Sequence, residues 1–238
     1  MCKNRIIYET LKPKTIVIGS SRIRQITNDS FKEPILILGV NGASIEDHIT
    51  IAEMSIERFN PERILLGADP WLFNKYNDQF RWQSLNKEYQ IALKNIELNS
   101  KDFKILKNAK DNKSLFVYEK ILKNIYNSLN VRKLNLDFDK DDYKKQYKNI
   151  ILRNGQLVYA KQEIKNKLKP NIVKDSMYNY EFSQELYDNY KKFIDYIVNV
   201  HKKEVILVLS PYHLPSYELT IKSIPDYLVS EKKFKKLS

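Results

Sequence analysis

The chain has 238 residues, of which 42% are hydrophobic and 12% aromatic, and its formal net charge is +12 at pH 7. This composition excludes an intrinsically disordered protein and is enough for one sizeable α/β domain with a buried core. Five glycines and eight prolines argue against a loop-rich all-β protein. The positive charge is weak evidence for a nucleic-acid partner, because no nucleic-acid-binding motif accompanies it, and we expect no such partner.

The cysteine content and the apolar runs exclude several further classes of protein. Cys2 is the only cysteine, so the chain has no internal disulfide and no cysteine-ligated zinc cluster. No apolar run is long enough for a signal peptide or a membrane span. As written, the sequence therefore predicts a cytoplasmic protein, and we expect neither a metal nor a cofactor.

Four short apolar runs predict buried strands. Each is rich in isoleucine, leucine or valine, and apolar side chains follow one another without polar alternation, which indicates burial on both faces of a parallel sheet. Three of the runs end directly in glycine, and the fourth ends in Ser210-Pro211. The runs are TIVIG from Thr15, ILILG from Ile35, RILLG from Arg63 and EVILVLS from Glu204.

Two longer segments have helical periodicity. The segment Ser44–Phe59 has an apolar stripe, and Ser44 is placed to cap its N-terminus. The segment Ser183–Lys203 has a similar stripe, with Ser183 as its cap. His48 and His201 lie in these two segments, where we expect structural or surface roles.

The order of these elements predicts an α/β fold with a doubly wound, flavodoxin-like, mostly parallel sheet of four to five strands flanked by helices. We expect a single domain over residues 1–238. Residues 75–180 are expected to form a helical insertion or cap within it. The insertion has helical patterns at Leu85–Leu98 and Ser114–Leu129, and a turn within Arg153–Tyr159.

In such a sheet the functional site lies at the carboxyl ends of the strands. Four loops with small or polar residues follow the predicted strands and should meet there. They are Gly19-Ser20-Ser21, Gly39-Val40-Asn41-Gly42, Gly67-Ala68-Asp69 and Ser210-Pro211-Tyr212-His213.

At these loops the sequence resembles the SGNH/GDSL hydrolase superfamily. It is most similar to a divergent bacterial branch whose first motif reads G-S-S and which is associated with acyl-ester chemistry on surface polysaccharides. The resemblance covers roughly Thr15–Asn74 and the stretch VLSPYHLPSY near the C-terminus. It implies that Ser21 is the nucleophile and that the backbone N–H groups of Ser21 and Gly42 line the oxyanion hole. Members of the branch often carry a membrane anchor ahead of the first strand, which would place a longer form of the protein at the cell envelope.

Two positions depart from the family pattern. Asp69 occupies the third oxyanion-hole position, where the family usually has an asparagine; an ionised carboxylate accepts hydrogen bonds but cannot donate one to an oxyanion. The family base is a histidine in Asp-x-x-His after the last strand. Here His213 follows the fourth strand, Ser210 stands where the aspartate would be, and Glu218 is the nearest acid. We therefore expect the chain to stop before the family base and to be inactive or weakly active, with His213 as the candidate replacement.

Three functional hypotheses remain open. The first is an esterase or acyltransferase that acts on O-acyl groups of cell-surface glycans or small molecules through Ser21. The second is a non-catalytic module that binds a glycan or an anion in the same cleft. The third, a nucleotide-binding domain, lacks a glycine-rich fingerprint and a P-loop lysine. The predicted substrate-binding residues are Arg22, Asn41, Trp71 and Tyr212.

Overall fold

The computed structural model describes residues 2–77, 79–99, 149–159, 179–210 and 214–237. Four short 3₁₀ helices lie among its longer elements: η1 (Ser21–Gln25), η2 (Asn28–Ser30), η3 (Pro70–Phe73) and η4 (Arg81–Leu85). The longer elements of the first part are α1 (Cys2–Tyr8), β1 (Thr15–Gly19), β2 (Ile35–Gly39), α2 (Ile45–Phe59), β3 (Arg63–Gly67) and α3 (Asn86–Asn99). Those of the second part are β4 (Ile150–Ile151), β5 (Leu157–Val158), α7 (Gln184–Asn199), β6 (Glu204–Val208), α8 (Leu214–Ser223) and α9 (Asp226–Phe234).

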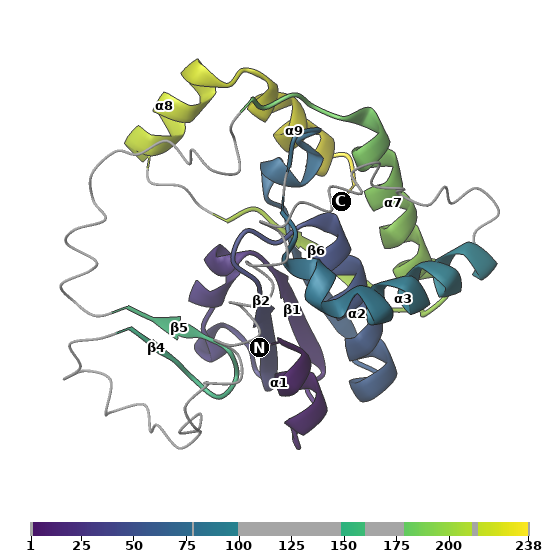
Figure 1. The fold of residues 1–238 in the computed structure, drawn as a ribbon. Helices are drawn as coiled ribbons and strands as arrows, with labels where there is room; N and C mark the ends of the chain where they lie inside the picture. The colour runs from purple at the N-terminus through teal and green to yellow at the C-terminus, as the bar shows by residue number, and fades with distance from the viewer. Residues whose placement is uncertain (1, 78, 100–148, 160–178, 211–213, 238) are drawn as a thin grey trace.

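The centre of the molecule is a four-stranded parallel sheet in the order β2-β1-β3-β6 (Figure 1). Each strand forms where the sequence predicts it, and the doubly wound α/β fold is confirmed. The chain steps from β1 outward to β2 and then crosses back to β3 on the other side of β1. The carboxyl ends of β1 and β3 therefore flank the point at which the winding reverses, where folds of this kind carry their ligands.

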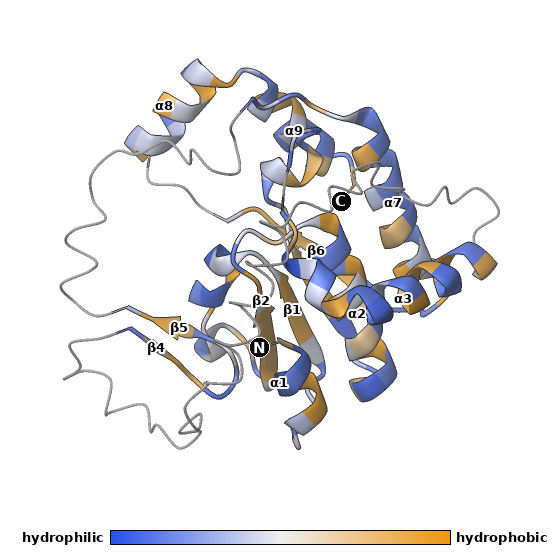
Figure 2. Ribbon diagram, viewed as in Figure 1, coloured by the Kyte–Doolittle hydropathy of each residue, from blue (hydrophilic) through white to orange (hydrophobic). Residues whose placement is uncertain are grey.

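One face of the sheet packs against α2 and α7, and α3 packs against these two helices (Figure 1). In Figure 2 these helices show apolar patches beside polar ones, as expected for helices with one buried side. Aromatic residues of α7 contribute much of this core, and Tyr190 and Phe193 are almost fully buried. The other face holds a smaller cluster, made of Val17, Ile23, Ile35, Ile37 and Leu65.

The glycines that end β1 and β3 allow η1 to lie close to the sheet. A Cβ atom added to Gly67 would lie 2.9 Å from Cγ2 of Ile23, and one added to Gly19 would lie 3.0 Å from the same atom. Ile23 thus packs across both strand ends because neither carries a side chain. This close contact fixes the start of η1 beside the end of β3.

Both predicted helix caps form. Ser44 accepts a hydrogen bond from the backbone N–H of Asp47, and the Asp47 carboxylate accepts one from the backbone N–H of Ser44, which completes a capping box. Ser183 caps α7 through the N–H of Leu186. The helix expected over Ser183–Lys203 ends earlier, at Asn199, and Lys202 adopts a left-handed conformation (φ 56°) that turns the chain into β6.

Two parts of the expected insertion are described. Helix α3 packs against α2, and its residues Tyr89, Leu93 and Ile96 are buried in the main core. The turn expected within Arg153–Tyr159 is the β4–β5 hairpin. The helical pattern at Ser114–Leu129 lies outside the described residues.

Within the described ranges, no helix combines the length and the apolar character that a membrane crossing requires.

Candidate functional site

The Ser20-Ser21 turn follows β1 and opens η1. Ser20 is buried, and its hydroxyl accepts a hydrogen bond from the backbone N–H of Arg22 at 3.2 Å, so Ser20 is the N-cap of η1. Ser21 is the first residue of η1 and is half-buried. The turn therefore assigns the capping role to Ser20 and leaves Ser21 as the more accessible hydroxyl.

The loop after β2 brings Asn41 and Gly42 to the same edge of the sheet. Gly42 has a φ of +61°, a conformation that side chains other than glycine rarely adopt. A Cβ atom at Gly42 would lie 2.9 Å from Oε1 of Gln79 and 3.2 Å from Nη1 of Arg81. The Oδ1 atom of Asn41 accepts a hydrogen bond from Nη1 of Arg24 at 3.1 Å, which ties this loop to η1.

Arg22 connects the ends of three strands. Its Nη2 atom donates to the carbonyl oxygen of Ser210, after β6, at 3.0 Å. Its Nη1 atom lies 3.9 Å from Oδ1 of Asp69, after β3, and its guanidinium carbon lies 5.9 Å from the centroid of the Trp71 ring. The side chain of Arg22 retains 18% of its exposed area, so a cation faces this edge of the sheet.

Asp69 is the carboxylate at the centre of the site. Its side chain is 2% exposed, and its Oδ2 atom has no hydrogen-bond partner among the described residues. Burial raises the pKa of the Asp69 carboxyl, whereas hydrogen bonding from Ser20 and the charge of Arg22 act in the opposite direction. Asp69 thus lies directly beside the Ser20-Ser21 turn, as the sequence motifs predict.

Trp71 lies in η3, two residues after Asp69, and is 3% exposed. Its Nε1 atom donates to the carbonyl oxygen of Ala43 at 3.3 Å, and its ring packs with Tyr227 of α9. These contacts hold η3 between α9 and the loop that precedes α2. A substrate-binding role for Trp71 stays a prediction, and the described contact that faces the site is the one with Arg22.

The histidines of the described residues have structural contacts. His48 is fully buried; its Nδ1 lies 2.9 Å from the Tyr190 hydroxyl, and burial lowers the pKa of His48 to about 3. Nε2 of His201 lies 3.4 Å from Oε2 of Glu53, before β6 begins. In the described part of the chain neither imidazole contacts Ser21, as expected for structural histidines. His213 and Tyr212 lie outside the described residues, and Glu218 is exposed on α8.

The structure adds four residues that the motifs do not single out. Arg24, Gln79 and Arg81 surround the loop of Asn41 and Gly42, and Tyr190 connects the site to His48. Burial raises the pKa of Tyr190, and a negative charge on Asp69 would act in the same direction. Among the residues that the structure describes, no three histidine, cysteine or carboxylate side chains form a metal site.

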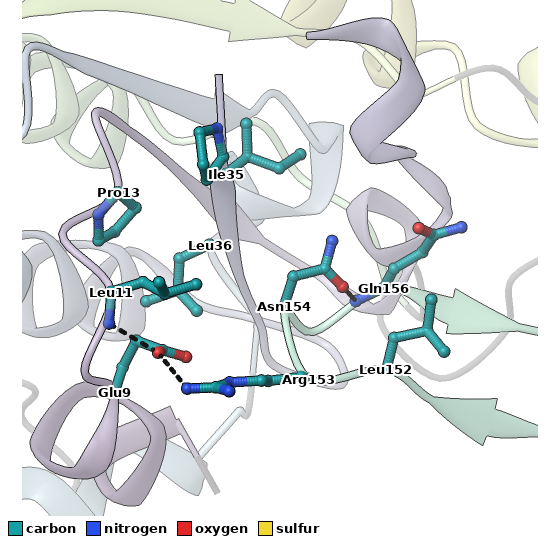
Figure 3. A pocket seen from close by; sticks show the side chains of 10 residues that line it. Glu9, Leu11, Pro13, Ile35, Leu36, Leu152, Arg153, Asn154 and Gln156 are labelled. Carbon is teal, nitrogen blue, oxygen red and sulfur yellow. Dashed lines mark hydrogen bonds and ion pairs between the residues drawn. The ribbon is translucent and has the colours of Figure 1, made fainter. Parts of the chain in front are cut away.

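A cavity of about 240 Å³ lies away from this edge, between the start of β2 and the β4–β5 hairpin (Figure 3). Its walls include Leu11, Ile35 and Leu152, and at one side Nη2 of Arg153 lies 3.2 Å from Oε1 of Glu9. Ile35 is the first residue of β2, whereas the candidate site follows the last residue of that strand. The cavity is therefore separate from the Ser21 site.

Comparisons with protein-family models, curated proteins and solved structures give no match for this chain. Function is accordingly inferred from the sequence motifs and from the geometry at the carboxyl ends of β1, β2, β3 and β6.

Proposed function

We propose that the chain is an SGNH-hydrolase-like protein whose site carries out ester hydrolysis or acyl transfer through an acyl-enzyme at Ser21. The proposed substrates are O-acyl groups of cell-surface glycans. The observation that carries the proposal is the position of Ser21. It follows β1, and its two neighbours Ser20 and Arg22 lie against Asp69 after β3, at the edge where a doubly wound sheet holds its ligand.

The proposed reaction follows the chemistry of a serine nucleophile. The Ser21 oxygen forms a bond to the acyl carbon, the hydroxyl proton passes to a base, and the ester C–O bond breaks as the alcohol leaves with a proton. The backbone N–H groups of Ser21 and Gly42 stabilise the oxyanion of the tetrahedral intermediate. His213, three residues after Ser210, is the candidate base. Because it has no aspartate at the family spacing, we expect slow turnover.

Hydrolysis of an aryl acetate tests the role of Ser21. We expect a slow release of the phenol that Ser21→Ala reduces to the uncatalysed rate, together with an acetyl adduct on Ser21 detected by mass spectrometry. Ser30→Ala, which changes an exposed serine of η2, should leave the rate unchanged. Equal turnover by the wild type and Ser21→Ala would refute the nucleophile.

A pair of histidine variants tests the base. Slow turnover that does not respond to His213→Ala would show that His213 is not the base. Fast turnover that His213→Ala abolishes, with His201→Ala as the unaffected control, would show that His213 is the base and that the expectation of weak activity is wrong.

The alternative is a module that binds a glycan or an anion without turning it over. It is favoured by the partly exposed guanidinium of Arg22 at this edge and by the absence, among the described residues, of an imidazole in contact with Ser21. Binding of inorganic phosphate or of an acidic oligosaccharide that survives Ser21→Ala, without ester turnover, would support this module. If neither probe binds, this alternative fails.

A further inference from the structure

Asp69 is a buried carboxyl group that receives hydrogen bonding from Ser20 but lacks a described partner at one of its two oxygens. One of its oxygens, Oδ2, is buried without a hydrogen-bond partner among the described residues. The nearest described cation, Nη1 of Arg22, lies 3.9 Å from Oδ1, which is too long for a hydrogen bond. Burial of an ionised carboxylate costs several kcal/mol unless hydrogen bonds or a close cation offset that cost.

The other groups that face Asp69 are neutral. Ser20 contributes a hydroxyl and a backbone N–H from the start of η1, and Tyr190 contributes a phenol from α7. Tyr190 in turn contacts His48 of α2, which is uncharged because burial lowers its pKa to about 3. Arg22 is the one described cation whose charge acts on Asp69.

The acidic residues of α9, which packs against η3, are directed elsewhere. The Asp226 carboxylate accepts a hydrogen bond from the backbone N–H of Phe182, and the Glu231 carboxylate accepts one from the Tyr217 hydroxyl. The protonation of Asp69 is therefore decided by its burial, which favours the neutral form, against the hydrogen bonds from Ser20 and the charge of Arg22, which favour the ionised form. Burial is the larger effect, and it raises the pKa of Asp69.

We propose that Asp69 is a neutral carboxylic acid in the folded protein and that it donates a hydrogen bond to the oxyanion formed at Ser21. The donation rests on the proposed function, whereas the protonation of Asp69 does not. A protonated carboxyl has one O–H donor, so it supplies what an ionised carboxylate lacks at this position. The protonated carboxyl would donate a hydrogen bond to the oxyanion as a neutral amide does. Unlike an amide, it would stop donating once the pH is high enough to ionise it.

The stability of Asp69→Asn as a function of pH tests whether Asp69 is protonated in the folded protein. If the folded protein keeps the Asp69 proton while the unfolded chain releases it near pH 4, wild-type stability falls as pH rises above that value. Asparagine is a neutral isostere without this dependence. We therefore expect the difference in Tm, Asp69→Asn minus wild type, to grow by about 3 °C per pH unit from pH 5 upward.

The control is Asp195→Asn, which changes an exposed carboxylate 2.6 Å from Nζ of Lys191. Its difference in Tm from the wild type should vary little over the same range. The proposal is wrong if Asp69→Asn is less stable than the wild type at pH 7 and recovers at low pH, because that result requires an ionised Asp69 held by Arg22.

A second measurement uses the wild-type protein, so it does not depend on whether a variant folds. Wild-type protein with ¹³C-labelled aspartate carboxyls should keep one carboxyl resonance at its protonated chemical shift at pH 8. Asp47, whose pKa is raised by burial to about 6, is ionised by then. Complete ionisation of all aspartates at pH 8 would overturn the proposal.

Turnover of the aryl acetate tests the donation. Asp69→Asn should be at least as active as the wild type at pH 7 and should lose the decline of kcat at high pH that the ionisation of Asp69 causes. Asp69→Leu, which has no donor, should lower kcat at least tenfold with little change in KM. If Ser21 is not acylated while the Tm difference still widens with pH, the proposed function and the hydrogen bond to the oxyanion are both refuted. In that case the protonation of Asp69 in the folded protein is still supported.

Discussion

The burial of His48 beside Tyr190 has a direct consequence for the stability of the protein in acid. The pKa of His48 is about 3 in the folded protein because of burial, against about 6.5 in an unfolded chain. As pH falls below 6.5, only the unfolded state takes up the proton, so the free energy of unfolding decreases. The loss amounts to about 2 kcal/mol at pH 5 from this residue alone.

His48→Gln should remove that contribution while it keeps a hydrogen-bonding group near Tyr190. Urea denaturation at pH 7 and pH 5 should show a loss of free energy of unfolding about 2 kcal/mol smaller in His48→Gln than in the wild type. The matched control is His201→Gln, which should keep most of the wild-type loss. Equal losses in the wild type and His48→Gln would mean that His48 titrates normally.

Asp47 acts in the opposite direction at the start of α2. Burial raises its pKa to about 6, against the hydrogen bonds from Ser44 that favour the ionised form. The folded state therefore retains the proton longer than the unfolded state, and the free energy of unfolding falls between about pH 4 and pH 6, by roughly 2–3 kcal/mol.

Thermal unfolding of Asp47→Asn from pH 4 to pH 8 measures this effect. The variant should gain stability relative to the wild type up to about pH 6 and then show a constant difference, since Asp47 is fully ionised above that range. Asp188→Asn, an exposed position of α7, is the control. A variant that is less stable than the wild type at every pH would show that the capping box requires the ionised carboxylate.

At the scale of elements, the β4–β5 hairpin covers the outer edge of β2. The carbonyl oxygen of Asn154 accepts a hydrogen bond from the backbone N–H of Ile37 at 2.6 Å. Gly155 has a φ of +94°, and a Cβ atom there would lie 1.9 Å from the carbonyl oxygen of Ile37. Only glycine allows this approach, so the edge strand depends on one residue of the hairpin.

Gly155→Ala should therefore detach the hairpin turn from β2. We expect the amide of Ile37 to lose at least tenfold protection from hydrogen exchange, and Tm to fall by a few degrees. Asn154→Ala keeps the backbone carbonyl and the glycine, so it should retain the protection. Unchanged exchange at Ile37 in Gly155→Ala would show that the hairpin does not protect this edge.

The elements also show what a sequence pattern can predict. The strands and the caps of α2 and α7 were predictable because each depends on a local signal, such as Ser44 before an apolar stripe. Helix α8 was not, because Pro215 reads as a turn signal although proline is tolerated in the first turn of a helix.

At the scale of the whole molecule, the parallel sheet and the edge that carries the site followed from the order of the apolar runs. The sequence motifs placed Ser21 and Asp69 at one edge, and the structure puts them there. The buried group formed by Asp69, Tyr190 and His48 could not be predicted. It depends on α7 packing beside α2, and the helical stripe of α7 does not distinguish Tyr190 from the other buried aromatic residues.

The position of β6 also determines the order in which the sheet can assemble. Arg63 and Glu204 face each other in the ladder of β3 and β6, 141 residues apart in sequence, and Nε of Arg63 lies 2.7 Å from Oε2 of Glu204. Strands β1, β2 and β3 all lie within the first 67 residues. Closing the long loop to β6 costs more chain entropy than pairing these three strands, so β6 should join last. During synthesis on the ribosome, a three-stranded intermediate with an open β3 edge would then precede the complete sheet.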